Sequence, residues 1–347
     1  MGVSTGRRWQ WGALGACVIA VASAAGCGGG GEDASTDNAV VPQAAAGADM
    51  RAANRRALPY NRQGVTAIAS STDGSAIGVA SSDGRIRIQN TASGAWRVLR
   101  PAGGAAAAGL IFVANGKYLV AVGRDSVAQA WEVASGDAKF TLRGHEHGLR
   151  SISASSNGAV VATAGDETRV MVWDGATGRL KRILTGASDF VNAVSVSADG
   201  HWLASGDAAA RVLVWNIDTG KLVHTLRGHA GEVNAVAFSA DARTLVSAGE
   251  DGKVLLWDAA SGAQIAALQS GGAAQRSIAF DASGALIAAG AVDGRVTVWD
   301  TGTRKVTEQW VGSDGAVNAL AFDMQNKRQV LTGDAERGIR AWPTRRE

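Results

Sequence analysis

The feature that most constrains this chain is a spacing, because six tryptophans recur at intervals of 42 residues with one final interval of 43. They are Trp131, Trp173, Trp215, Trp257, Trp299 and Trp342. One interval before the first of them stands Gln89, in a segment that alternates like those around the tryptophans. A fixed period of this length indicates supersecondary units that stack on one another. The sequence therefore predicts seven units over residues 53–347.

Each unit has the pattern of four short strands. In the fifth unit, four apolar or alternating segments are separated by turn residues; they are residues 233–238, 244–247, 253–257 and 264–268. Between the second and third, Asp251-Gly252 supplies a two-residue turn that requires positive φ. Four strands in about 42 residues make one propeller blade. We therefore predict an all-β, seven-bladed β-propeller of four-stranded blades, with the tryptophan rings packed between neighbouring blades.

Two recurring dipeptides place the repeat in a known class. Tryptophan is followed by aspartate at Trp173-Asp174, Trp257-Asp258 and Trp299-Asp300, and a Gly-His pair occurs at Gly144-His145 and Gly228-His229. On these residues the chain resembles the WD-repeat family over residues 53–347. The resemblance implies a structural hydrogen-bond network built on the histidine of the Gly-His pair. Its expected members are His229, Ser247, Asp251 and Trp257 in the fifth unit, and His145, Thr163, Trp173 and Glu167 (in place of aspartate) in the third.

The seventh unit is one strand short, because the chain ends just after the third strand of that unit, at Trp342. Aligning residues 64–65 with residues 148–149 places residues 54–58 on the fourth-strand segment 138–142. We therefore predict that the amino-terminal segment completes the last blade and covers its open edge.

The amino-terminal sequence has the pattern of a targeting segment. Arg7 and Arg8 precede a short apolar run and then small residues, so residues 1–26 are predicted to be a secretory signal peptide. The run is too short and too rich in glycine and alanine to favour a transmembrane helix. Ala24-Ala25-Gly26-Cys27 resembles the bacterial lipobox, which implies acylation of Cys27. Simple cleavage and an uncleaved anchor remain the alternatives.

Residues 27–52 contain too little apolar bulk to fold and are expected to form a flexible tether. The expected location is the periplasmic side of a bacterial cell envelope, with the membrane reached through a lipid anchor. If the cell has two membranes, Gly28 favours the outer one, because the aspartate associated with inner-membrane retention is missing there.

Charge and cysteine content exclude some partners and chemistry. The chain has 34 basic and 31 acidic residues, and without Arg7 and Arg8 the balance is 32 against 31. No concentrated basic face is indicated, so nucleic acid is not an expected partner. Both cysteines, Cys17 and Cys27, lie in the amino-terminal segment, which leaves the propeller without disulfide or thiol chemistry.

No motif for a catalytic site, a cofactor or a metal is present in the propeller. His145-Glu146-His147 could offer two metal ligands, but the resemblance already assigns His145 to the structural network. A Ser/His/Asp triad assembled across the channel is left open as a possibility. The chain is therefore predicted not to be an enzyme and to need no cofactor.

The resemblance also implies where a partner would bind. In WD-repeat propellers, partners often contact the rim where each first strand begins, and the residue before the turn between second and third strands. Carried over by alignment, these positions include Arg124, Arg150, Asp166, Phe190, Asn192, Glu232, Asn234, Glu250, Arg276 and Asn318. The first two units otherwise offer small residues there, namely Gly64, Thr66, Ser82, Ala106 and Ala108. Arginine and aromatic residues are frequent in interface cores, so this arc is the candidate binding surface.

The function predicted from these features is a monomeric, lipid-anchored propeller that acts as a scaffold for a protein or peptide partner. A propeller enzyme or small-molecule receptor that uses the central channel is the alternative, because the fold alone does not decide function. A purely structural component of the envelope is a third possibility.

Overall fold

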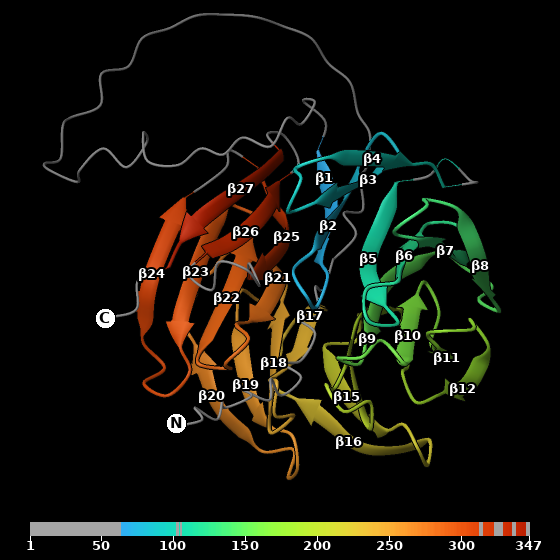
Figure 1. Cartoon of the computed structure of the whole chain (residues 1–347). Helices are drawn as coiled ribbons and strands as arrows, with labels where there is room; N and C mark the ends of the chain where they lie inside the picture. Colours follow the sequence, from blue (N-terminus) through green and yellow to red (C-terminus); the bar gives the residue numbers. More distant parts are fainter. Residues whose placement is uncertain are drawn as a thin grey trace, which may run out of the picture.

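The computed structural model describes residues 64–101, 104, 106–311, 315–322, 329–334 and 338–344, with the backbone alone for residues 338 and 339. Within these ranges the chain forms 27 strands in seven antiparallel sheets (Figure 1). Six sheets have four strands and one has three. The described ranges hold no helix with the length and apolarity needed to cross a membrane. The prediction of an all-β, seven-bladed propeller is confirmed.

The strands follow one another in chain order from blade to blade. The first three blades contain β1 (Val65–Ser70), β2 (Ala76–Ser81), β3 (Ile86–Asn90), β4 (Trp96–Leu99), β5 (Ala107–Val113), β6 (Tyr118–Gly123), β7 (Val127–Glu132), β8 (Ala138–Arg143), β9 (Leu149–Ala154), β10 (Val160–Gly165), β11 (Val170–Asp174) and β12 (Leu180–Leu184). The fourth to sixth contain β13 (Val191–Val196), β14 (Trp202–Asp207), β15 (Arg211–Asn216), β16 (Lys221–Arg227), β17 (Val233–Phe238), β18 (Thr244–Gly249), β19 (Val254–Asp258), β20 (Gln264–Leu268), β21 (Gln275–Phe280), β22 (Leu286–Ala291), β23 (Arg295–Asp300) and β24 (Val306–Val311). The seventh contains β25 (Val317–Phe322), β26 (Gln329–Asp334) and β27 (Gly338–Pro343).

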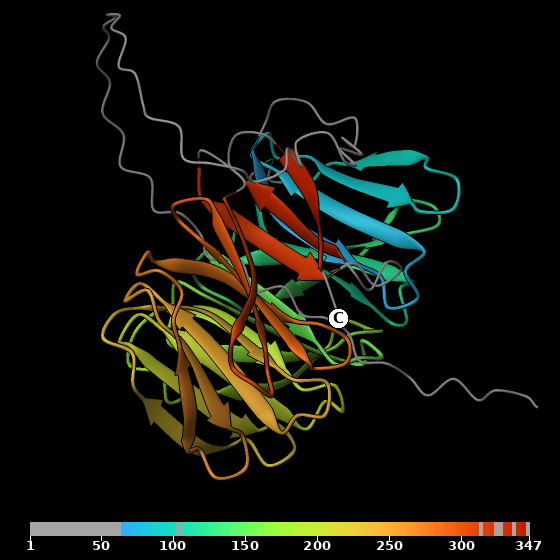
Figure 2. The same cartoon turned by 90° about the vertical axis from the view of Figure 1, so that its left-hand side faces the viewer.

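The blades stand side by side in a ring, and the first strand of each blade is the innermost (Figures 1 and 2). Neighbouring first strands contact one another from β1 and β5 around to β21 and β25. Strand β1 also contacts β25 and β26, so the seventh blade lies against the first. The ring therefore has no gap between its first and last blades.

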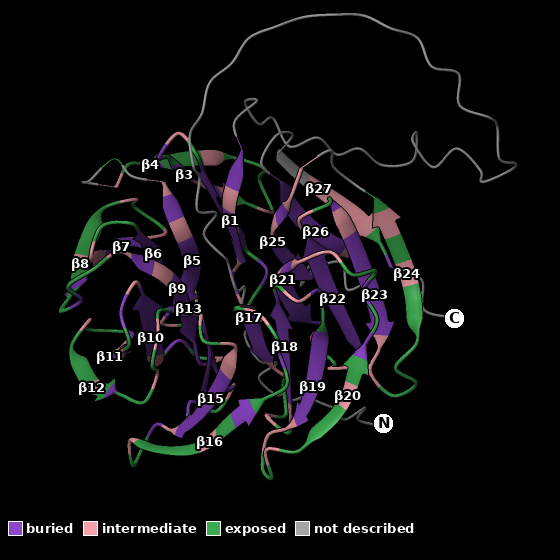
Figure 3. Ribbon diagram, turned by 180° about the vertical axis from the view of Figure 1, so that it is seen from behind, coloured by how far each residue is buried: buried purple, intermediate pink, exposed green. Residues whose placement is uncertain are grey.

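The hydrophobic core lies between the sheets. Five of the six periodic tryptophans are at most 3% exposed, and Trp257 packs in one cluster with residues of the fourth and sixth blades. A buried tryptophan removes roughly 150–250 Å² from water, so these rings hold adjacent blades together, as predicted. The sixth, Trp342, is half-buried and stacks on Trp310 of the preceding blade at 5.6 Å between ring centroids. Figure 3 shows the gradient from buried inner strands to largely exposed outer strands such as β8, β12, β20 and β24.

Two strand predictions need small corrections. The second strand of the fifth blade runs to Gly249 rather than residue 247, and the third occupies Val254–Asp258 rather than 253–257. The antiparallel ladder explains the difference, because it pairs Thr244 with Asp258 and Ala248 with Val254. The segment 54–58, expected to supply the fourth strand of the seventh blade, lies outside the described residues. The described seventh sheet has the order β25-β26-β27.

Candidate functional site: one end of the ring

A β-bulge occurs near the start of the first strand of every blade. The pairing with the second strand skips one residue at the same place in each repeat, at Thr66, Ala108, Arg150, Asn192, Asn234, Arg276 and Asn318. These seven positions are spaced by 42 residues throughout. A bulge leaves one residue unpaired and re-aims its side chain, and it often borders functional sites. Because first strands are innermost, the seven residues, here called the bulge ring, surround the axis at one end of the propeller.

In the third and fourth blades the bulge residues belong to a continuous polar network. The guanidinium of Arg150 donates hydrogen bonds to the carboxylate of Asp166 and to Asn192 Oδ1, the latter at 2.9 Å. Asn192 in turn donates from Nδ2 to Glu232 Oε2 at 3.1 Å. The network thus joins four of the predicted rim residues from three blades. The Asn192 side chain is buried, whereas Glu232 is exposed to solvent.

An aromatic side chain lies against this network. The ring of Phe190, in the loop that leads into β13, has its centroid 5.7 Å from Arg150 Cζ. Phe190 is nevertheless 45% exposed. A guanidinium over an aromatic face is a favourable cation–π arrangement. Arg150 therefore holds a large apolar ring in place at the surface.

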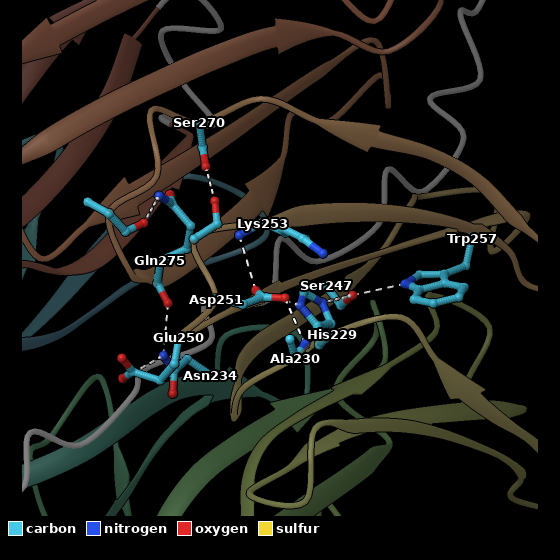
Figure 4. Close-up of polar contacts among 12 residues, drawn as sticks. His229, Ala230, Asn234, Ser247, Glu250, Asp251, Lys253, Trp257, Ser270 and Gln275 are labelled. Atoms are coloured by element: carbon cyan, nitrogen blue, oxygen red, sulfur yellow. Dashed lines mark hydrogen bonds and ion pairs between the residues drawn. The ribbon is translucent and has the colours of Figure 1, made fainter.

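The fifth blade has its own version of this contact. Asn234 Nδ2 donates to Glu250 Oε1 at 3.1 Å and to the backbone oxygen of Gln275 at 3.0 Å (Figure 4). The second bond ties the fifth blade to the start of β21 in the sixth. Gln275 itself is buried, and its amide donates to the backbone oxygen of Ala273 at 2.7 Å. Sequence reasoning missed Gln275, because its contribution is a backbone oxygen.

Three predicted rim residues remain, and two of them are not part of these contacts. Arg276 and Asn318 make no side-chain hydrogen bond or ion pair within the described ranges. Arg124 is exposed, and its backbone borders the third blade: a Cβ at Gly148 would lie 2.8 Å from the Arg124 oxygen and 3.2 Å from Asp166 Oδ2. The structure therefore places Arg124 beside the network.

The network built on His229 forms as the family resemblance implies (Figure 4). Trp257 Nε1 donates to Ser247 Oγ at 2.9 Å, Ser247 Oγ lies 2.8 Å from His229 Nε2, and His229 Nδ1 lies 3.0 Å from Asp251 Oδ1. Burial lowers the pKa of His229 and outweighs the opposing effect of Asp251. Burial alone would raise the pKa of Asp251, but hydrogen bonds from Ala230 N and His229 keep it below its ordinary value. A neutral imidazole that donates from Nδ1 to the carboxylate fits both shifts.

This Ser-His-Asp order matches that of a hydrolase triad, but its surroundings do not. Ser247 has no exposed surface, and its oxygen already accepts the indole N–H of Trp257. A nucleophile must reach its substrate. The arrangement therefore ties strands of one blade together and offers no hydroxyl to a ligand.

The third blade repeats the network with a longer carboxylate. His145 contacts Glu167 through Nδ1 and lies 2.7 Å from Thr163 Oγ1 through Nε2, and Trp173 Nε1 donates to the same hydroxyl at 2.7 Å. The extra methylene lets Glu167 also accept two hydrogen bonds from Arg169. Burial lowers the pKa of His145, with Glu167 opposing it.

The possible metal ligands His145, Glu146 and His147 do not converge on one site. Arg169 forms an ion pair with Glu146 at 2.9 Å, and His147 is exposed. No group of three or more His, Cys, Asp or Glu side chains in the described part of the chain is arranged to hold a metal ion.

Other contacts between blades had little signal in the sequence. Ser151 and Ser153 on β9 accept hydrogen bonds from the backbone N–H groups of Val194 and Val196 at 3.1 and 2.8 Å. Ser195 on β13 accepts in the same way from Phe238 N at 3.1 Å. The only hint was serine at alternate positions of these inner strands. These bonds fix neighbouring blades to each other close to the axis.

Seven antiparallel blades closed into a ring, with tryptophans between blades and buried His-based networks, define the chain as a WD-type propeller. The sequence profile of the family described as WD domain, G-beta repeat matches five stretches of the chain, at residues 55–90, 136–174, 178–216, 220–258 and 265–300. These stretches cover more than half of the sequence, and the chain belongs to this family. No curated protein matches the chain. The family prediction is confirmed, and WD-repeat propellers commonly bind protein partners.

Proposed function

We propose that this WD-repeat propeller is a scaffold that binds a protein partner on the face containing the bulge ring. The observation that carries the proposal is the Arg150 network, in which hydrogen bonds across three blades support an exposed Phe190. Interface hot spots are enriched in aromatic residues and arginine that are already held in place. A side chain that is ordered before binding loses less entropy when the partner docks. The proposed role is therefore recognition rather than catalysis.

The proposal extends to where the protein works. The basic start and short apolar run of residues 1–26, followed by the lipobox-like Ala24-Ala25-Gly26-Cys27, support export and acylation of Cys27. Residues 27–52 would then tether the propeller to a membrane of the bacterial envelope, the outer one if there are two. A Cys27→Ser variant should move from the membrane fraction to the soluble fraction. Unchanged membrane association of that variant would contradict the lipid anchor.

The proposed domain is a monomeric ring completed by its own amino-terminal segment. The first stretch that matches the family profile starts at residue 55 and ends at residue 90, which lies a whole number of 42-residue repeats before the ends of the later stretches at 174, 216 and 258. Those later stretches open on a fourth strand, such as β12 or β16, so residues 55–63 align with an outer strand. Pairing of this segment with β27 would cover the edge of the seventh sheet. Deletion of residues 53–60 should then lower the melting temperature of the propeller, and an unchanged melting temperature would contradict the closure.

The binding surface is tested by crosslinking and affinity purification from the native envelope, followed by mass spectrometry. The Arg150→Ala/Phe190→Ala double variant should capture about tenfold less of the partner than the wild type. Arg179→Ala/Leu180→Ala is the matched control, because Leu180 is also 45% exposed but lies at the opposite end of the third blade. Both variants should remain folded, with the Arg150/Phe190 variant losing only about 1–2 kcal/mol of unfolding free energy. Equal capture by the wild type and the Arg150/Phe190 variant would reject this surface.

A further inference from the structure

Six of the seven bulge-ring residues have polar side chains, Ala108 being the exception, and these six form two arcs that differ in how their polar atoms are bonded. Arg150, Asn192 and Asn234, in the third to fifth blades, are bonded to Asp166, Glu232 and Glu250 respectively, and Arg150 is also bonded to Asn192. We call these three the paired arc. The other arc contains Arg276, Asn318 and Thr66, in the sixth, seventh and first blades, which are neighbours because β25 contacts both β21 and β1. We call these three the open arc.

Every member of the open arc lacks a side-chain partner within the described ranges. Arg276 Nε and Thr66 Oγ1 are buried and have no hydrogen bond, and Asn318 makes none through its side chain. Buried polar groups in folded proteins are almost always bonded, so each exception calls for an explanation. A charged donor without a partner is the most costly of these. Within the described ranges, the unpartnered polar groups of three adjacent blades therefore point to a ligand that the described residues do not supply.

One substitution in the repeat explains why Arg276 has no partner. In the third blade, the residue sixteen positions after the bulge arginine is Asp166, which accepts from Arg150. The residue sixteen positions after Arg276 is Val292. The nearest carboxylate in that turn, Asp293, instead lies 3.6 Å from Arg295 Nη2. The sixth blade thus has the arginine but not the acid that balances it in the third blade.

We propose that the open arc binds a carboxylate side chain of an acidic peptide segment of the partner, with Arg276 as the residue that receives it. The proposal rests on the proposed function, because it assigns a chemical class to the ligand of the same face. An arginine fork matches the two oxygens of a carboxylate. The partly exposed Asn318 amide can donate to the same group or to the peptide backbone beside it.

The surroundings favour a carboxylate over a phosphate. Asn234 Nδ2 bonds both Glu250 and the backbone oxygen of Gln275, the residue before Arg276, so the Glu250 carboxylate lies close to the arc. A phosphate carries about two negative charges and would be repelled more strongly by that carboxylate. A single arginine beside one acidic residue suits a group with one negative charge.

The test uses an array of nine-residue peptides whose central position is each of the twenty amino acids or phosphoserine, with random flanks. The labelled full chain should select Asp and Glu at the centre. Arg276→Gln should bind the best acidic peptide about tenfold or more weakly, the loss expected for one charge-assisted hydrogen-bond pair. Arg295→Gln, in the same blade and with the same change of charge, should bind it like the wild type. Fluorescence anisotropy with that peptide gives the dissociation constants.

The other outcomes of this experiment would each contradict part of the inference. An acidic preference that persists unchanged in Arg276→Gln overturns the assignment of Arg276. Selection of phosphoserine well above Asp and Glu overturns the carboxylate. Peptides selected without any acidic preference overturn the inference and leave the proposed function standing. If no form selects a peptide, the inference is contradicted, whereas the scaffold function is still judged by the crosslinking experiment on Arg150 and Phe190.

Discussion

The third and sixth blades have the same strands and the same tryptophan, but they satisfy their polar groups to different degrees. In the third blade, Trp173 and His145 both bond the Thr163 hydroxyl. In the sixth, the corresponding positions hold Trp299, Gly271 and Ala289. Trp299 is only 1% exposed, and its Nε1 is therefore buried without a hydrogen-bond partner. Apolar packing between blades is thus sufficient to shape a blade, and the hydrogen-bond network is an addition to it.

The same contrast recurs at the bulge ring. Arg150 is balanced by Asp166, whereas Arg276 faces Val292 at the matching position. Because both blades fold alike, the difference concerns which groups remain available at the surface. The third blade uses its polar residues to support Phe190. The sixth blade leaves a guanidinium for something else to bind.

The largest effect is expected from making the third blade resemble the sixth. Thr163→Ala should lower the free energy of unfolding by about 2–3 kcal/mol, because it leaves Trp173 Nε1 and His145 Nε2 buried without partners. Urea denaturation followed by tryptophan fluorescence measures the change. Thr163→Ser is the control. It keeps the hydroxyl and should therefore retain most of the stability. A loss below 0.5 kcal/mol for the alanine variant would show that the network adds nothing to packing.

The histidine networks should also make the stability of the third and fifth blades sensitive to acid. The pKa of His229 is lowered from its ordinary 6.5 by burial, so below about pH 6.5 the unfolded state binds more protons than the folded state. The pKa of Asp251 is also lowered, from 3.8, and its contribution is lost at still lower pH. The melting temperature should therefore fall as the pH drops from 7.5 through 6.5. His145→Asn/His229→Asn should show a flatter profile between those values, and a parallel profile would contradict the assigned neutral imidazoles.

Much of this contrast could be predicted from the sequence, because the 42-residue lattice places corresponding residues in register. The blade number and the tryptophan positions followed from that spacing, and both histidine networks followed from the resemblance to the WD-repeat family. The links between Arg150, Asn192 and Glu232 did not, since they depend on side-chain conformations across three blades. The isolation of Arg276 depends on a residue sixteen positions away, and comparing that offset between units would have revealed it.

A smaller effect is expected from removing Asp166, the acid that is bonded to Arg150 of the paired arc. Asp166→Val should cost about 1 kcal/mol of unfolding free energy, because the pair with Arg150 is partly exposed to solvent. It should also loosen Phe190 and weaken capture of the partner. Chemical denaturation and the crosslinking yield report the two effects separately. Loss of neither stability nor capture would mean that the Arg150 network does not support Phe190.

The smallest effect is the reciprocal repair of the sixth blade. Ala289→Ser should supply a hydroxyl to Trp299 Nε1 and raise the free energy of unfolding by about 0.5–1 kcal/mol. Ala288→Ser at the adjacent buried position should instead destabilise the propeller, because it buries a hydroxyl with no unpaired donor beside it. Differential scanning calorimetry of the two variants gives opposite signs if the account is correct. Destabilisation by both would show that the sixth blade has no room for the network.

The most direct test of the account restores the missing acid beside Arg276. Val292→Asp should give this arginine the partner that Arg150 has in the third blade. Binding of the acidic peptide, measured by anisotropy, should weaken about tenfold or more, while the propeller remains at least as stable as the wild type. Val292→Asn, which has nearly the same shape without the charge, should bind the peptide more tightly than the aspartate variant. Undiminished binding by Val292→Asp would contradict the claim that the open arc receives a carboxylate.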